Sequence, residues 1–206
     1  MDKQGMLIVL SGPSGSGKGT IVSRLLKEHD DMVLSISATT RAPRAGEIDG
    51  VHYYFLTREQ FTQMREDNQF LEWAEYNGQY YGTPEAPIRD WLAAGKNVIL
   101  EIEVQGAERV MDCRADLISI FITIPSMEEL RRRLIGRGSE TEESIRARMG
   151  VAKRELQRAF RYDYVVINDE VDLAVERINT IVEAETMRYG RMEQCIMEVL
   201  DNAETQ

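Results

Sequence analysis

The chain has 206 residues, of which 43% are hydrophobic and 29% are charged, and its formal net charge is −10. This balance is typical of a folded soluble domain with a sizeable core and excludes a disordered chain. The acidic pI of about 4.9 argues against a protein that coats nucleic acid or binds anionic membranes, because the overall field repels polyanions.

Positive charge is concentrated in one part of this acidic chain. Residues 131–161 hold nine arginines and one lysine against four glutamates, so this segment carries +6 and the rest of the chain −16. A short basic segment within an acidic protein favours the capture of a small anion over a long polyanion.

The remaining global features predict a cytoplasmic protein. Cys113 and Cys195 lie far apart without a CxxC pattern, which is typical of free thiols and predicts neither a disulfide framework nor a zinc site. The first apolar run has only five residues, which is too short for a signal peptide, and no run approaches the ~20 residues of a membrane span.

Short apolar runs alternate with helical patterns along the chain. Such runs are typical of strands buried on both faces of a parallel sheet. The expected strands are 6–10, 33–37, 97–104, 117–124 and 164–167. Ser126-x-x-Glu129 predicts a capping box at a helix start, and a long helix is expected from Val171 to about Met187. The alternation predicts an α/β fold of the P-loop type, with a parallel sheet flanked by helices.

Residues 38–84 break this rhythm with turn signals and short aromatic segments (VHYYF, FLEWAEY and QYY), so we expect a small mixed-β insertion there. The polar, glycine-containing segment 136–142 predicts a mobile flap between two arginine-bearing helices. The acidic tail from about 186 to 206 is expected to begin as a helix, which either covers the core or forms a dimer contact. The oligomeric state, monomer or homo-oligomer, therefore stays open.

These breaks divide one compact chain into three regions. A core that carries the glycine-rich loop is expected from 1–37, 84–125 and 160–206. The insertion is 38–83, and an arginine-rich helical region is 126–159.

The most specific motif is the glycine-rich segment that begins at Gly12 and ends at Lys18. It follows a buried strand and opens a helix, which is the context of a phosphate-binding loop. Glycines let backbone N–H groups turn toward phosphate oxygens, the helix N-terminus adds donors, and Lys18 supplies a point charge. The residues expected to contact a nucleoside triphosphate are Gly12, Pro13, Ser14, Gly15, Ser16, Gly17, Lys18, Gly19 and Thr20.

The residue after the lysine departs from the usual loop. Gly19 stands where a serine or threonine normally binds Mg²⁺, and Thr20 follows it. Water and phosphate oxygens can hold the metal instead, with Thr20 as a further candidate ligand. The Gly-Lys-Gly-Thr form resembles nucleoside monophosphate kinases more than GTPases, and the sequence contains no Asn-Lys-x-Asp motif of GTPases.

Two arginines, Arg41 and Arg44, flank a proline turn soon after the second expected strand. Each guanidinium presents a planar fork of donors, so the pair suits a phosphate monoester. Taken alone, the segment is equally compatible with a solvated loop.

These two segments and four others resemble guanylate kinases, the enzymes that transfer phosphate from ATP to GMP. The matching segments are GPSGSGKGT (12–20), SISATTRAPRAGEIDGVHYYF (35–55), FLEWAEYNGQYYGT (70–83), ILEIEVQGA (99–107), RRRLIGRGSETEESIRARM (131–149) and VVINDE (165–170). They span the chain from 7 to about 185. The resemblance implies core, GMP-binding and lid regions, with ATP, Mg²⁺ and GMP (and dGMP) as cofactor and substrates, and neither nucleic acid nor a membrane as partner.

The resemblance also implies roles at matching positions. The GMP phosphate would be bound by Arg41, Arg44, Tyr53 and Tyr81. Guanine would be read by Ser37, Glu72, Thr83 and Glu103. The lid arginines that close over the transferring phosphoryl group would be Arg133, Arg137 and Arg148, and Asn168 would lie near adenine. The groups expected to act in catalysis are Lys18, Arg41, Arg137 and Arg148.

Residue chemistry supports guanine at one of these positions. Guanine presents two donors side by side, N1–H and the exocyclic amino group, and an ionised carboxylate only accepts, so Glu72 can take both. Adenine would place its N1 acceptor against the same lone pairs and be rejected. The alternative role for Glu72 is that of an outward-facing carboxylate on a strand.

Glu101 and Glu103 are two residues apart on the expected strand 97–104, which places both on one face at its carboxyl end, where α/β proteins bind ligands. We assign Glu101 to Mg²⁺, directly or through water, and Glu103 to the base. Several other arginines are expected to pair with glutamates, as Arg158 can with Glu155 at helical spacing. These are Arg131, Arg132, Arg154 and Arg161.

Two competing functions remain. A kinase for another nucleoside monophosphate is disfavoured by Glu72 and by the hydroxyls of Ser37 and Thr83. A non-catalytic binding module of the guanylate kinase type, which captures phosphopeptides, is disfavoured by Lys18 and the lid arginines, because a scaffold needs neither.

Overall fold

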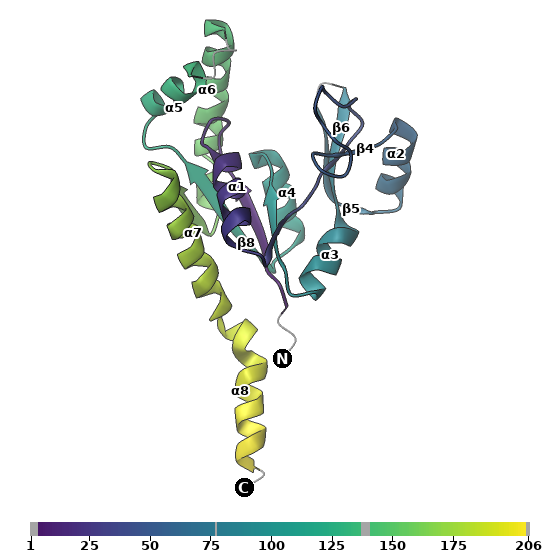
Figure 1. Cartoon of the computed structure of the whole chain (residues 1–206), viewed down its shortest axis with the longest axis vertical. Coiled ribbons are helices and arrows are strands. Elements are labelled where there is room, and N and C mark those ends of the chain that lie inside the picture. Colours follow the sequence, from purple (N-terminus) through teal and green to yellow (C-terminus); the bar gives the residue numbers. More distant parts are fainter. Residues whose placement is uncertain (1–3, 77, 137–140, 205–206) are drawn as a thin grey trace.

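The computed structural model describes residues 4–76, 78–136 and 141–204, with side chains as far as Asp201 (Figure 1). Its main sheet is parallel, with the strand order β2-β7-β1-β8-β9. The strands are β1 (Leu7–Ser11), β2 (Met32–Leu34), β7 (Asn97–Glu101), β8 (Leu117–Thr123) and β9 (Tyr164–Ile167). Every residue of the central strand β1 is buried, as its continuous apolar run predicts. The predicted α/β fold with a parallel sheet is confirmed.

Helices cover both faces of this sheet. The α-helices outside the insertion are α1 (Lys18–Glu28), α3 (Glu85–Ala93), α4 (Val104–Cys113), α5 (Met127–Ile135), α6 (Glu142–Leu156), α7 (Val171–Thr186) and α8 (Tyr189–Glu204). Ile8 and Leu10 of β1 join one core cluster with residues of α1 and α7, whereas Leu7 and Val9 join another with residues of α3 and α4. This division follows from the alternation of side chains along a strand. The long helix predicted from Val171 is α7.

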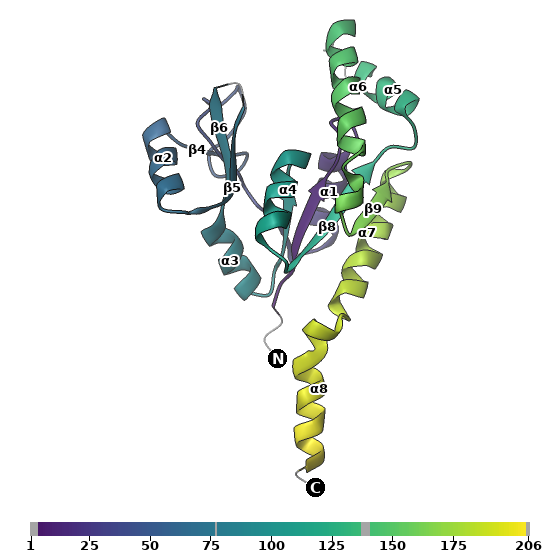
Figure 2. The same cartoon turned by 180° about the vertical axis from the view of Figure 1, so that it is seen from behind.

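The insertion forms a second sheet, in the order β4-β3-β6-β5. Its strands are β3 (Ala38–Thr39), β4 (Tyr54–Phe55), β5 (Phe70–Tyr76) and β6 (Gln79–Pro84), and α2 (Arg58–Glu66) packs beside them. Strand β3 is parallel to β4 and antiparallel to β6, so the predicted mixed-β insertion is confirmed. The ring of Phe61 stacks on Phe70, with 4.4 Å between centroids, which explains why this segment is aromatic. Figures 1 and 2 show this sheet and the α5–α6 pair on opposite sides of α1 and α4.

Two expected strands are shorter than predicted. Strand β2 ends at Leu34, and the carbonyl of Ser37 accepts a hydrogen bond from Tyr54 N (2.9 Å) in the second sheet. Strand β7 ends at Glu101, and Glu103 is the N-cap of α4. The strand-face argument for Glu101 and Glu103 was therefore wrong, because the backbone turns into a helix between them.

Two local pairings were also wrong. Ser126 Oγ caps α5 by accepting from Glu129 N (3.1 Å), but the carboxylate of Glu129 pairs with arginines of its own helix and does not close the box. Arg158 pairs with Glu108 (2.7 Å) on α4 and not with Glu155. Structural ion pairs are confirmed for three arginines, with partners Arg131–Glu142, Arg132–Glu129 and Arg161–Asp112.

No α-helix in the described part of the chain is long and apolar enough to cross a bilayer.

Candidate nucleotide-binding site

The glycine-rich loop joins the carboxyl end of β1 to the start of α1. Gly12, Gly15 and Gly17 have φ angles of 143°, 93° and 91°, in the region that favours glycine. A Cβ on Gly12 would lie 2.0 Å from the carbonyl oxygen of Ile122, and one on Gly17 would lie 2.3 Å from Asn168 Nδ2. The loop thus needs glycine for both its conformation and its contacts.

Lys18 is the first residue of α1 and turns back over this loop. Its Nζ donates to the carbonyl oxygens of Gly12 (2.5 Å) and Pro13 (3.2 Å). A phosphate group bound in the loop would offer charged acceptors in place of these neutral ones, and charged acceptors form the stronger hydrogen bonds. The ammonium group can therefore exchange these carbonyl oxygens for phosphate oxygens when a triphosphate binds.

Glu101 lies beside the start of α1. A Cβ on Gly19 would lie 3.5 Å from Glu101 Oε1 and 3.9 Å from Oε2, so the missing side chain leaves room over this carboxylate. Burial raises the pKa of Glu101, and the nearby charge of Lys18 opposes that effect. Carboxylate oxygens next to substrate phosphates are the ligands that Mg²⁺ prefers, so the residues fit this ion. Thr20 is exposed one position further along α1.

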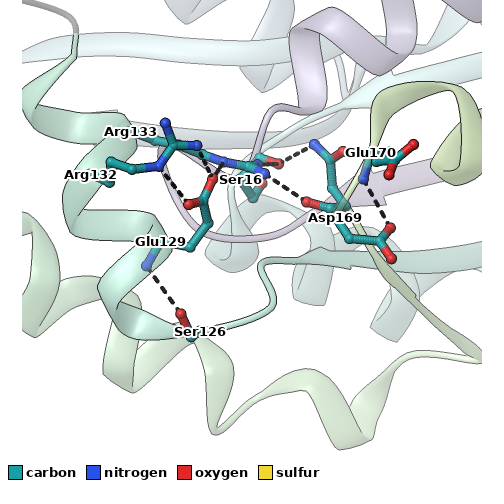
Figure 3. A network of polar contacts seen from close by, with 8 residues as sticks. Ser16, Ser126, Glu129, Arg132, Arg133, Asp169 and Glu170 are labelled. Carbon is teal, nitrogen blue, oxygen red and sulfur yellow. Dashed lines mark hydrogen bonds and ion pairs between the residues drawn. The ribbon is translucent and has the colours of Figure 1, made fainter.

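The opposite side of the loop is held by a polar network from α5 and the end of β9 (Figure 3). Asn168 Nδ2 donates to the carbonyl of Ser16 (2.7 Å), and Arg133 donates to the carbonyls of Asn168 (2.8 Å) and Ser16 (3.3 Å). Glu129 accepts from Arg133 Nε (2.7 Å), and arginine neighbours lower the pKa of Glu129 to about 2. Both predicted residues, Arg133 and Asn168, thus contact the loop backbone.

A second arginine of the predicted lid reaches the loop from α6. Arg148 Nη1 donates to Ser14 Oγ at 3.2 Å. Arg137 lies outside the described residues. The basic segment recognised in the sequence therefore supplies cations to the phosphate-binding loop from two helices, α5 and α6.

The proline turn of the insertion gathers a second set of charged and aromatic side chains. Arg41 makes a bidentate ion pair with Glu47, with both N–O distances at 2.9 Å, and its guanidinium lies 5.4 Å from the ring centre of Tyr53. Glu47 Oε2 also accepts from Arg44 N (2.7 Å), and these contacts lower its pKa to about 2. The rings of Tyr53 and Tyr81 meet edge to face, with 6.2 Å between centroids. Four predicted phosphate ligands are thus gathered around one turn.

A half-buried carboxylate lies further along the same sheet. Glu72 of β5 pairs in register with Thr83 of β6, and its Oε1 accepts from Thr83 Oγ1 at 2.7 Å. Burial is the main cause that raises the pKa of Glu72. A Cβ on Gly106 would lie 3.4 Å from Glu72 Oε2, so α4 begins directly opposite this carboxylate. Glu103 precedes Gly106 by three residues and is exposed at the N-cap of α4.

Known proteins are similar to this chain over most of its length. The sequence profile of the guanylate kinase family matches residues 4–185. The guanylate kinase of Halalkalibacterium halodurans is 55% identical over 193 residues (93% of this chain and 95% of that protein), and one from Clostridium perfringens is 52% identical over 197 residues (96% and 91%). The crystal structure of guanylate kinase from Anaplasma phagocytophilum superposes with a TM-score of 0.73 at 37% identity, covering 92% of this chain and 90% of that one.

The chain belongs to the guanylate kinase family. The resemblance found in the sequence is therefore confirmed, and the chain is an enzyme of the guanylate kinase type that phosphorylates GMP with ATP. Most of the described residues named from the sequence fall into two groups in the structure. One group surrounds the loop between β1 and α1, and the other lies on the second sheet and its arginine turn, from Arg41 to Glu72 and Thr83. Glu103 lies apart from both, at the start of α4.

Sequence reasoning missed two acidic residues in this guanylate kinase. Glu47 accepts hydrogen bonds from the guanidinium of Arg41 and from the backbone N–H of Arg44. The only indication of this role in the sequence was its position three residues after Arg44. Glu155 of α6 is within the electrostatic reach of Glu103 and Lys18, and burial raises its pKa. Its Oε2 has no hydrogen-bond partner among the described groups, and nothing in its helical spacing distinguished it from a surface glutamate.

Proposed function

We propose that the two groups of residues bind ATP and GMP separately and align them for transfer of the γ-phosphate, which gives ADP and GDP. The 2′-hydroxyl of GMP has no ligand in this scheme, so dGMP is proposed as a second substrate. The observation that carries the choice of base is the half-buried Glu72, which accepts a hydrogen bond from Thr83 at 2.7 Å on the sheet that also carries the arginine turn. A carboxylate at this place matches the two adjacent donors of guanine and repels the N1 acceptor of adenine.

Each substrate has its own set of ligands in this proposal. The triphosphate of ATP lies in the loop from Gly12 to Thr20, with Arg133 and Asn168 behind the loop. The phosphate of GMP is bound by Arg41, Arg44, Tyr53 and Tyr81. Guanine is read by Ser37, Glu72, Thr83 and Glu103. Phosphoryl transfer requires in-line positioning and neutralisation of charge, which we assign to Lys18, Arg41, Arg137 and Arg148.

The three regions named from the sequence are proposed to close on the substrates. The insertion (38–83) and the arginine-rich region (126–159) stand on opposite sides of α1 and α4 (Figures 1 and 2). The main sheet of the core (1–37, 84–125 and 160–206) lies between them. Closure would bring the lid arginines and the arginine turn together and would exclude the water that otherwise hydrolyses ATP.

Mg²⁺ is proposed as the cofactor, and it supplies further neutralisation of the phosphate charge. Glu101 would hold it, directly or through water, with Thr20 as a second candidate. The Gly19→Ser variant should need several-fold less Mg²⁺ for half-maximal activity, because its hydroxyl provides the loop ligand that this chain lacks. The Cβ that it adds makes an ordinary contact at 3.5 Å with Glu101.

The Mg²⁺ dependence of ADP formation at saturating ATP and GMP tests this prediction. Gly19→Ala is the matched control, because it adds the same Cβ without the hydroxyl. If the alanine variant shifts the Mg²⁺ requirement as much as the serine variant, the effect does not come from metal ligation.

The proposed function is tested by measuring ADP formation from ATP and Mg²⁺ with GMP, dGMP, AMP, CMP and UMP in turn. Turnover is expected with GMP and dGMP and not with the other three. Turnover of AMP equal to that of GMP would overturn the assignment of Glu72 to guanine. Absence of turnover with every nucleotide would favour a phosphopeptide-binding module.

A further inference from the structure

Strand β5 is an edge strand of the second sheet, and helix α4 of the core packs beside it (Figures 1 and 2). On one side β5 pairs with β6, so the carbonyl groups on its other side have no partner among the described strands. One carbonyl of β5, that of Trp73, accepts a hydrogen bond from Nη1 of Arg109 on α4. This contact joins the core to the insertion at the residue that follows Glu72.

Two residues of α4, one helical turn apart, act on the carboxylate of Glu72. Gly106 and Arg109 are three residues apart, which places them on one face of the helix. A Cβ on Gly106 would lie 3.4 Å from Glu72 Oε2, so the glycine lets the helix approach this carboxylate closely. The positive charge of Arg109 opposes the rise in the pKa of Glu72 that burial causes. The face of α4 opposite Glu72 thus combines a close approach with a cation.

The charge of Arg109 is not neutralised by an ion pair. In the part of the chain that the structure describes, no carboxylate lies within ion-pair distance of its guanidinium, Glu72 included. The preceding residue, Glu108, pairs instead with Arg158 (2.7 Å) and Arg161 (3.5 Å), which follow the end of α6. Because the hydrogen bond of Arg109 goes to a neutral carbonyl, its charge remains available to act on Glu72 over a longer distance.

The other polar groups around β5 do not supply this charge. On β6, the group that contacts Glu72 is the neutral hydroxyl of Thr83 (2.7 Å). On α2, Arg65 lies 5.1 Å from the ring centre of the residue that follows Glu72. Neighbouring residues of a strand point to opposite faces, so Arg65, and Glu75 further along β5, lie on the face away from Glu72. Glu103 is exposed at the start of α4 and is within electrostatic reach of a carboxylate on α6.

We propose that Arg109 is a positioning residue for guanine recognition, which holds β5 against α4 and stabilises the negative charge of Glu72. The proposal rests on the proposed function, because it takes Glu72 as the residue that reads guanine. The ionised carboxylate accepts from both guanine donors, whereas the protonated form carries a donor of its own. A cation near Glu72 favours the ionised form, so the chain keeps its affinity for GMP to a lower pH than Glu72 would allow alone.

Arg109→Gln should raise KM for GMP about threefold at about pH 5.5 and leave it within about 1.5-fold of the wild type at about pH 8. Loss of the cation raises the pKa of Glu72, so a larger fraction of this carboxylate is protonated at the lower pH. At the higher pH it is ionised in both proteins. The effect is only a few-fold because Arg109 is exposed and water screens its charge. The value of kcat should stay within about twofold, since Arg109 contacts the carbonyl of Trp73 and not the phosphate-binding loop.

The rate of ADP formation at saturating ATP gives KM and kcat at each pH. Each KM is expressed as a ratio to that of the wild type at the same pH, which removes effects common to all variants, such as protonation of the GMP phosphate. Arg109→Lys keeps the charge and should follow the pH dependence of the wild type. Arg89→Gln is the matched control, because Arg89 is exposed on α3 beside Asp90 (3.9 Å), and its KM ratio should stay near one at both pH values.

A purely structural role for Arg109 would give the same KM ratio at both pH values, and that result would overturn the proposal, as would Arg109→Lys behaving like Arg109→Gln. The double variant Glu72→Gln/Arg109→Gln should show no pH-dependent rise in KM beyond that of Glu72→Gln, because no carboxyl group is left to titrate. A further rise would show that Arg109 acts through another group.

Glu72→Gln also separates this proposal from the proposed function. If Glu72→Gln alone leaves KM for GMP unchanged, the assignment of Glu72 to guanine fails, and the role of Arg109 fails with it. If Glu72→Gln weakens GMP binding but the effect of Arg109→Gln does not depend on pH, only the role of Arg109 is wrong.

Discussion

Replacing Lys18 with alanine should lower kcat by about 1000-fold and leave the affinity for GMP within about twofold of the wild type. The ammonium group is the point charge at the mouth of the loop, where it contacts the carbonyls of Gly12 and Pro13. Its removal takes a cation from the transferring phosphoryl group but touches none of the proposed GMP ligands. Steady-state ADP formation gives kcat, and isothermal titration calorimetry gives the dissociation constant of GMP.

Lys27→Ala is the matched control for this prediction. Lys27 lies in the last turn of the same helix and is exposed, so its replacement should change neither quantity. Lys18→Arg should fail to restore kcat, because a planar guanidinium does not replace a compact ammonium group in a tight loop. If the Lys18→Ala variant loses GMP binding as well, the two substrate sites are not separate as proposed.

The features that sequence analysis predicted correctly depend on local patterns. The loop from Gly12 to Lys18 was identified because the strand before it, the glycines and the helix after it are contiguous in the chain. The core strand β1 was predicted for the same reason, since its first four residues belong to a continuous apolar run and all five of its residues are buried. Such patterns contain the physical cause of the structure within ten or twenty residues.

The features that were missed depend on partners distant in the chain. Arg158 pairs with Glu108, fifty residues earlier, and not with Glu155, which is only three residues earlier but belongs to the helix that ends at Leu156. Glu129 does not complete the capping box, because its carboxylate pairs with Arg133. The side chain of Arg133 in turn contacts the loop that begins at Gly12. Glu103 changes from a strand residue to a helix cap because β7 ends where α4 begins. Each case is a competition between a local preference and a tertiary contact, and only the three-dimensional arrangement decides it.

Replacing Glu72 with glutamine should lower kcat/KM for GMP by about 100-fold or more and reduce the preference for GMP over AMP. Glutamine is isosteric and retains an oxygen that can accept from Thr83, but its amide presents one acceptor and one donor to the base. It therefore loses one guanine contact and gains a pattern that adenine can match. Glu75→Gln, on the same strand and exposed, is the control and should retain both kcat/KM values.

The pH dependence of GMP binding distinguishes this role of Glu72 from a structural one. Only the ionised carboxylate accepts from both guanine donors, and burial raises the pKa of Glu72 above that of an ordinary glutamate. KM for GMP should therefore rise as the pH falls, and it should do so at a higher pH than an exposed carboxylate would cause. The Glu72→Gln variant should lose this dependence. Its melting temperature should not fall, because the substitution removes a charge that the folded protein desolvates. A variant that keeps both the pH dependence and the preference for GMP would show that another group reads the base.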